Sequence, residues 1–172
     1  MPLLIWVLGL LPLLVLSPRM EGTPFLIEGT PAFREATLQA WEMVPPSLRV
    51  YVRSARVIRQ VDDPGSPVYD CWPWEQEADL CNKGADLGER AIRVTRSMWL
   101  GDRRRYTGRL VHEGWHLYAD QNRQLGDGDG FAPGGMAGEA MAIGLQVAAL
   151  RQMGYSSEAV RTLEAAVGVH GR

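Results

Sequence analysis

The residues best suited to chemistry lie together in one short segment, residues 110–118. His112 and His116 are four positions apart, with Glu113 directly after the first of them. On an α-helix, side chains four positions apart lie one turn above each other, so the two imidazoles can reach one point. Neutral imidazole is a good zinc ligand, and Glu113 is close enough to accept a proton from water on the metal. The spacing therefore predicts a zinc ion held by the two histidines, with Glu113 as general base.

Uncharged residues surround this motif, namely Leu110, Gly114, Trp115, Leu117 and Tyr118. His-Glu-x-x-His in such a setting resembles the active-site helix of the zincin metallopeptidases. The resemblance implies a hydrolase that cleaves peptide bonds in a peptide or protein substrate. Arg109 and the mid-helix Gly114 depart from the usual pattern, because Gly inside a helix costs about 1 kcal/mol relative to Ala.

A catalytic zinc site needs a third protein ligand and leaves one position for water. Glu139 follows His116 by 23 residues and lies at the start of an expected helix. Its segment, GEAMA at residues 138–142, is similar to the glutamate helix of gluzincins, which include thermolysin-like and ImmA/IrrE-like proteins. The resemblance implies that Glu139 is the third ligand. It departs at Ile143, where thermolysin-like sequences carry an aspartate that orients a ligand histidine. The alternative role for Glu139 is that of a carboxylate favoured by the helix dipole.

Further candidates surround such a site. Asp120, one turn after His116, and His170, two residues from the end of the sequence, are the other possible ligands. We expect Asp120 instead to accept the free N–H of a ligand histidine, because its short side chain lies on the same helix. The oxyanion donor is open between Tyr155, His170 and Tyr118, which the sequence does not rank.

Composition is that of an ordinary globular protein. The 172 residues are 46% hydrophobic and 22% charged, which suffices for one domain with a buried core. The net charge of −2 gives no sign of a nucleic-acid footprint, so we expect no nucleic-acid partner.

An apolar run occupies residues 3–16. It is too short for a spanning helix, which needs about 20 residues, and suits the core of a signal peptide. We therefore divide the chain into residues 1–21, a signal peptide or N-terminal membrane anchor, and residues 22–172, the folded domain. A Gly-, Thr- and Pro-rich connector over residues 22–31 marks the boundary. The protein is then expected outside the cytoplasm, secreted or attached to a membrane through the apolar run. The alternatives are an apolar arm packed on the domain, or a translation start at Met20.

The two cysteines, Cys71 and Cys81, are too far apart in sequence for the usual pairs of zinc ligands. In an exported protein they would form a disulfide that stabilises the fold by about 2–3 kcal/mol. Two buried free thiols are the alternative, and the choice between them depends on export.

Hydrophobic periodicity predicts a helix over residues 32–43 and a strand over residues 48–61, bulged near Ser54. A turn-rich segment follows. A second strand is expected over residues 91–95, where the zincin resemblance implies a sheet edge that binds an extended substrate.

The motif helix is expected over residues 103–124, with Asp102 as its N-cap. A Gly-rich loop over residues 125–138 follows and is a candidate lid. Next come a helix over residues 139–153 and a last helix capped by Ser157.

These elements predict an α+β fold, a minimal zincin-like domain. A small, mostly antiparallel sheet would pack on the motif helix, followed by the Glu139 helix and a C-terminal helix. Two other functions fit the same sequence. One is a zincin-like module whose zinc is structural and which acts as a binding or regulatory domain without catalysis. The other is an exported helical domain whose histidines bind no metal.

Overall fold

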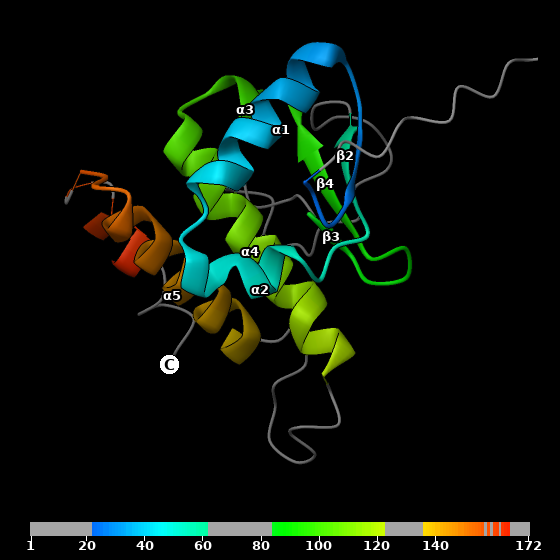
Figure 1. Ribbon diagram of the computed structural model, residues 1–172. Coiled ribbons are helices and arrows are strands. Elements are labelled where there is room, and N and C mark those ends of the chain that lie inside the picture. The colour runs from blue at the N-terminus through cyan, green and yellow to red at the C-terminus, as the bar shows by residue number, and fades with distance from the viewer. Residues whose placement is uncertain are drawn as a thin grey trace, which may run out of the picture.

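The computed structural model describes residues 22–61, 84–122, 136–156, 158, 160, 161 and 163–165. Helices and a small sheet are combined, so the predicted α+β class is confirmed. The elements are β1 (Leu26–Glu28), α1 (Pro31–Met43), the 3₁₀ helix η1 (Pro46–Leu48), α2 (Arg49–Val52), β2 (Val57–Val61), β3 (Ala85–Asp86), β4 (Ala91–Thr95), α3 (Arg96–Leu100), α4 (Arg103–Gln121) and α5 (Met136–Gln152). Figure 1 shows α4 running between the sheet and α5, with α1 and α2 beside it.

The strands form one mixed sheet in the order β1-β2-β4-β3. β1 pairs with β2 and β2 pairs with β4 in parallel, and only β3 and β4 are antiparallel. The prediction of a mostly antiparallel sheet was therefore wrong. Parallel neighbours need a crossover connection, and α1 and α2 supply it between β1 and β2. The prediction missed this because β1 has three residues and lies inside the segment expected to be a connector.

The position of β4 also differs from expectation. Residues 91–95 do form a strand, as predicted, but β4 lies between β2 and β3. In the part of the chain that the structure describes, the sheet edge on this side is β3.

The segment 48–61, predicted as one bulged strand, is divided between two kinds of structure. Its first residues form α2, and the strand β2 begins only at Val57. Leu48 and Val52, four positions apart, are both buried, whereas Val50 between them is 47% exposed. That is helical spacing, so the prediction of a single strand over residues 48–61 was wrong.

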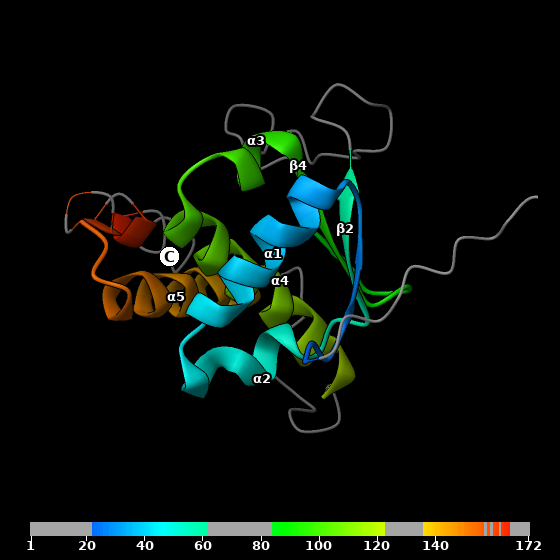
Figure 2. The same ribbon diagram turned by 45° about the horizontal axis from the view of Figure 1, so that its top comes forward.

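One face of the sheet packs on the helices. Ile27, Ile58 and Ile92 are register partners on adjacent strands, and all three are buried. They belong to one hydrophobic core together with Leu110 and Val111 of α4. Figure 2 shows the sheet at one side of the helices. The core therefore fixes α4 against the inner face of the sheet.

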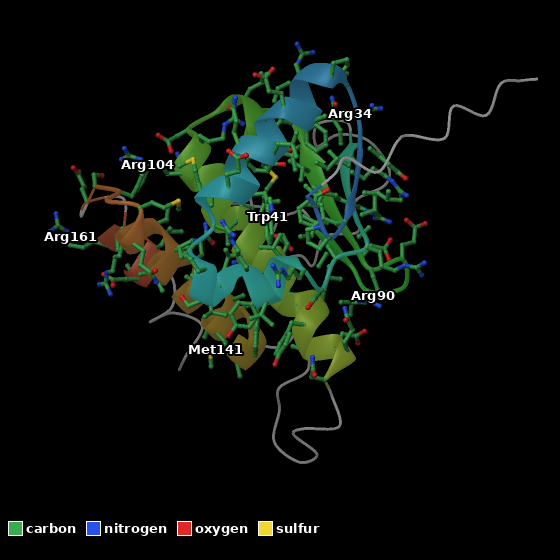
Figure 3. The ribbon with its side chains drawn as sticks, viewed as in Figure 1. Arg34, Trp41, Arg90, Arg104, Met141 and Arg161 are labelled. Carbon is green, nitrogen blue, oxygen red and sulfur yellow. The ribbon has the colours of Figure 1, made fainter. Side chains whose placement is uncertain are left out.

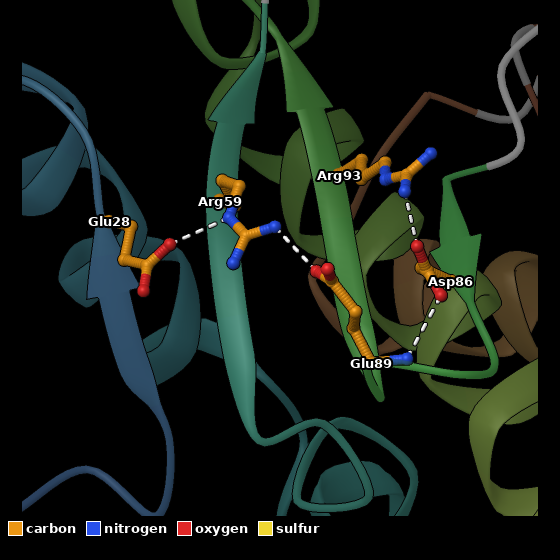
Figure 4. Close-up of polar contacts among 5 residues, drawn as sticks. All are labelled: Glu28, Arg59, Asp86, Glu89 and Arg93. Atoms are coloured by element: carbon orange, nitrogen blue, oxygen red, sulfur yellow. Dashed lines mark hydrogen bonds and ion pairs between the residues drawn. The ribbon is translucent and has the colours of Figure 1, made fainter. Parts of the chain in front are cut away.

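The other face of the sheet carries charges that cross the strands (Figure 4). Arg59 on β2 pairs with Glu28 on β1 through Nε and Oε2 at 2.6 Å, and with Glu89 through Nη1 and Oε2 at 2.5 Å. Arg93 on β4 pairs with Asp86 on β3. We call the Glu28–Arg59–Glu89 group the sheet ladder.

α1 begins and ends close to the predicted bounds. Thr30 is its N-cap and accepts a hydrogen bond from the backbone N–H of Phe33. Trp41 lies on the inner side of α1 and is 7% exposed, whereas Arg34 and Arg90 lie at the periphery (Figure 3).

α4 is the central element and contacts α1, α2, α3, α5, β3 and β4. Asp102 is its N-cap, as predicted, and accepts from the backbone N–H groups of Arg104 and Arg105. The helix ends at Gln121, three residues before the predicted end. α5 begins at Met136, so Glu139 lies within its first turn rather than at its first residue.

The predicted last helix is described only in part: residues 158, 160, 161 and 163–165 are helical, and Ser157 lies outside the described residues. None of the described helices combines the length and the apolar character needed to cross a membrane.

Candidate metal centre

α4 presents both histidines of the motif to one point. The Nε2 atoms of His112 and His116 are 3.2 Å apart. The two residues are only 3% and 6% exposed. The helical spacing predicted from the sequence therefore brings the two imidazoles together in a buried place.

Glu139 reaches the same point from α5. Its Oε1 lies 3.1 Å from Nε2 of His116, and its Oε2 lies 3.4 Å from Nε2 of His112. The Glu139 side chain is 38% exposed, so the group is open to solvent on this side. Trp115 holds the start of α5 in place, because its indole Nε1–H donates to the backbone carbonyl of Gly138 at 3.2 Å.

These distances fit a tetrahedral zinc ion. Ligand bonds of 2.0–2.1 Å place neighbouring donor atoms about 3.3 Å apart. The Nε2 atoms of His112 and His116 are 3.2 Å apart, and they lie 3.4 Å and 3.1 Å, respectively, from different carboxylate oxygens of Glu139. One side of the group is half-exposed, which is where a catalytic site would keep its open position.

The protonation state of His112 also suits a metal ligand. His112 donates from Nδ1 to the amide oxygen Oε1 of Gln146 at 3.1 Å, because a carbonyl oxygen can only accept. Burial lowers the pKa of His112, with the charge of Arg109 acting in the same direction, so the ring is neutral. Its Nε2 therefore carries a lone pair, which faces a carboxylate oxygen of Glu139 and a second imidazole. Nitrogen and oxygen atoms that converge in this way could hold a metal ion.

The Glu139 carboxyl is ionised. Burial by itself would raise its pKa, but the two imidazoles beside it lower the pKa by more, to well below its usual range. An anionic oxygen and two imidazoles form a donor set that suits zinc.

Glu113 lies beside the two histidines but faces a different partner. A carboxylate oxygen of Glu113 is within 4.8 Å of the ligand atoms of His112 and His116. Its Oε1 forms an ion pair with Nε of Arg109, one turn earlier on α4, at 2.7 Å. The backbone of Gly84, just before β3, packs so closely that a Cβ there would overlap the Glu113 carboxyl.

Two acidic residues could thus complete the histidine pair. We favour Glu139 as the ligand, because its oxygens are 3.1 and 3.4 Å from the two Nε2 atoms. Glu113 also lies within 4.8 Å of both histidines, but one of its oxygens pairs with Arg109 at 2.7 Å. Glu113 then lies beside the candidate metal position, where a general base would act.

Gly114, atypical for an active-site helix, has a packing role. A Cβ at this position would lie 2.7–2.8 Å from backbone atoms of Tyr51 and Val52 in α2. Only glycine allows the two helices to approach this closely.

Two of the predicted oxyanion donors, Tyr118 and Tyr155, pack elsewhere than beside the histidines. The ring of Tyr118 packs edge-to-face on Tyr51 of α2. It follows His116 by two residues, about 200° around the helix. Tyr155 follows the C-terminal end of α5 and packs against the apolar cluster of Ile143, Val147, Leu150 and Val160, whereas Glu139 lies in the first turn of α5.

Three predicted residues lie outside the described part of the chain: His170, Cys71 and Cys81. Asp120 is half-buried and lies one turn beyond His116 on α4, and its role as an acceptor for a ligand histidine stays a prediction.

A shallow cavity of about 660 Å³ lies elsewhere, with a lining that includes Leu26, Arg53, Arg56, Val57 and Arg90. It contains none of the residues of the candidate centre, and two of its cations, Arg59 and Arg90, already have partners. The candidate metal centre therefore does not lie in this cavity.

Sequence reasoning missed two contacts of the centre. The Arg109–Glu113 pair could have been found, because the residues are four apart on one helix face. The signal for Gln146 is weaker: it follows Glu139 by seven residues, two helical turns, which puts it on the same face of α5.

Comparison with known proteins gives no match. No family model matches the sequence, no curated protein is significantly similar to it, and no solved structure matches it. The resemblance to zincins therefore rests on the motif residues themselves, and the functional inference rests on the geometry of His112, His116 and Glu139.

Proposed function

We propose that the chain is a zinc-dependent peptidase of the zincin type, in which His112, His116 and Glu139 hold the metal and Glu113 is the general base. The single observation that carries the proposal is the convergence of three metal-binding side chains at 3.1–3.4 Å from one another. When bound, zinc would polarise a peptide carbonyl and lower the pKa of a bound water to about 7.

Glu113 supplies the proton transfer in this proposal. Its carboxylate accepts a proton from the attacking water and returns it to the leaving amine. Its backbone neighbours, His112 and Gly114, lie in the interior of α4, so the carboxylate is held on a rigid element.

An extended peptide substrate fits beside β3. This strand is at the edge of the described sheet, and Gly84, directly before it, contacts the Glu113 carboxyl. An edge strand offers unpaired backbone donors and acceptors to which a peptide can add as a further strand. The substrate backbone would then run past the base and the metal position.

A second candidate is a zincin-like module with structural zinc and no catalysis, which acts by binding a partner. The ion pair between Arg109 and Glu113 favours it, because one oxygen of the base is engaged at 2.7 Å. In both proposals the chain is exported, either secreted or attached to a membrane through residues 3–16, and Cys71 is paired with Cys81.

Replacement of Glu113 by Gln separates the two candidates. Glu113→Gln keeps the shape and removes the base, so chelator-sensitive hydrolysis of an unstructured protein such as casein should fall by about 10²–10⁴. Zinc content should stay unchanged, since Glu113 is not a ligand. Glu42→Gln, an exposed change on α1, is the matched control and should leave the rate unchanged. A Glu113→Gln protein as active as the parent would refute the peptidase mechanism, and a parent that binds zinc without hydrolysis would support the binding module.

A further inference from the structure

α5 presents two polar side chains to His112, not one. Glu139 approaches its Nε2, and Gln146, two turns later on the same helix, accepts from its Nδ1–H at 3.1 Å. Between them on this face lies Ile143, which is 6% exposed and belongs to an apolar cluster with Val147 and Leu150. An imidazole that binds a metal through one nitrogen needs an acceptor at the other, and the structure gives His112 an amide oxygen for this purpose.

The amide of Gln146 is itself held in a fixed place. Gln146 is 8% exposed, and His112 is 3% exposed. Gly108, one turn before His112 on α4, makes room for its stem, because a Cβ there would lie 3.2 Å from Cγ of Gln146 and 3.3 Å from Cγ of Leu150. The close packing of α4 on α5 therefore keeps the Gln146 amide next to the His112 ring.

We infer that Gln146 is a positioning residue of the centre, whose amide oxygen fixes His112 as the Nδ1–H tautomer and directs the Nε2 lone pair to the metal. This inference rests on the proposed metal centre. A neutral amide orients the ring without adding a charge, so it holds the tautomer but raises the basicity of the imidazole less than a carboxylate would. Replacing the amide by a carboxylate should therefore keep the tautomer and strengthen zinc binding.

The tautomer can be measured without any metal. Long-range ¹H–¹⁵N correlation spectra of the metal-free full chain report which imidazole nitrogen carries the proton. We expect Nδ1–H for His112 in the parent and in Gln146→Glu, and a mixture or the Nε2–H form in Gln146→Met, which keeps the length but lacks the amide oxygen. Gln152→Met, the same change at an exposed position of α5, should resemble the parent.

Competitive chelator titrations of the same proteins give the second readout. Gln146→Met should bind zinc about 10–100-fold more weakly than the parent, the usual loss for an outer partner of a ligand histidine. Gln146→Glu should bind at least as tightly as the parent. Should Gln146→Met fail to fold, the Gln146→Glu protein decides: loss of the Nδ1–H tautomer or weaker zinc binding there would overturn the inference.

The two proposals fail in different ways. A parent chain that takes up no zinc refutes the metal centre, whatever its tautomer. A parent that binds zinc but has Nε2–H in the metal-free state, or a Gln146→Met protein with parental tautomer and affinity, overturns the role of Gln146 and leaves the metal centre intact.

Discussion

The molecule has two clusters of charged and polar side chains, and they are built in opposite ways. In the sheet ladder, Arg59 lies between two carboxylates, each within 2.6 Å of a guanidinium nitrogen. In the candidate centre, a carboxylate and two imidazole nitrogens converge at 3.1–3.4 Å, and no positive side chain lies among them in the described contacts. The ladder supplies its own counter-charge, whereas our proposal assigns that role in the centre to a metal ion.

Burial sharpens this difference. The ladder side chains are 35–54% exposed, so water screens their charges. The two histidines are almost fully buried, and converging acceptors there are costly unless a metal or a proton lies between them. A close group of charges therefore predicts a ligand only where its own members do not neutralise each other.

The largest expected effect comes from removing the anionic member of the centre. Glu139→Ala leaves two protein nitrogens on the metal, so zinc affinity should fall by more than the roughly 100-fold that bounds the loss of an outer partner. Glu28→Ala removes a carboxylate from the ladder and should leave zinc affinity unchanged. Competitive chelator titration of folded proteins gives both values.

Asp120→Ala completes this test. If Asp120 is an outer partner of a ligand histidine, Asp120→Ala should lower zinc affinity by about 10–100-fold. If Asp120→Ala strips the metal while Glu139→Ala keeps it, the third ligand is Asp120 and our assignment of Glu139 is wrong.

A smaller effect tests what holds the centre in place. Strand register aligns the ladder, but the centre depends on the close approach of α2 to α4 at Gly114. Gly114→Ala adds a Cβ against backbone that cannot move aside, so it should lower the free energy of unfolding by about 1–3 kcal/mol. A Cβ at Gly144 on α5 would have no atom within 4 Å. Gly144→Ala should therefore raise the free energy of unfolding by up to about 1 kcal/mol.

Denaturant unfolding of the two glycine variants measures these changes. Equal effects at both positions would show that Gly114 has no special packing role and that only helix propensity matters.

The smallest effect is expected in the ladder. Arg59→Met removes two half-exposed ion pairs, each worth at most about 1 kcal/mol, and the loss should shrink as salt is added. Zinc affinity should stay at the parental value. A loss of zinc binding in this variant would show that the two clusters are coupled and would break the comparison between them.

Local signals in the sequence predicted the elements that carry the site. Asp102 as a cap and the spacing of His112 and His116 predicted α4, and the segment around Glu139 predicted α5 to within three residues of its start. These features depend on neighbours along the chain, so sequence patterns capture them.

Features that depend on packing between distant segments were not predicted. β1 is too short to show a period, so the parallel sheet was missed. Gln146 is a neutral residue, and its contact with His112 exists only because α5 packs on α4. The sequence marked Gly114 as atypical, but not why it is needed. It makes room for the backbone of α2, which lies more than sixty residues earlier in the chain.

Metal content tests the central claim most directly. The purified chain, analysed for elements by mass spectrometry, should contain one zinc per molecule, lose it to a strong chelator and regain it when zinc is added back. The double variant His112→Ala/His116→Ala should contain none. A folded parent chain that carries no near-stoichiometric metal, and takes none up, would contradict the account, and His112, His116 and Glu139 would then be a hydrogen-bonded network without a metal.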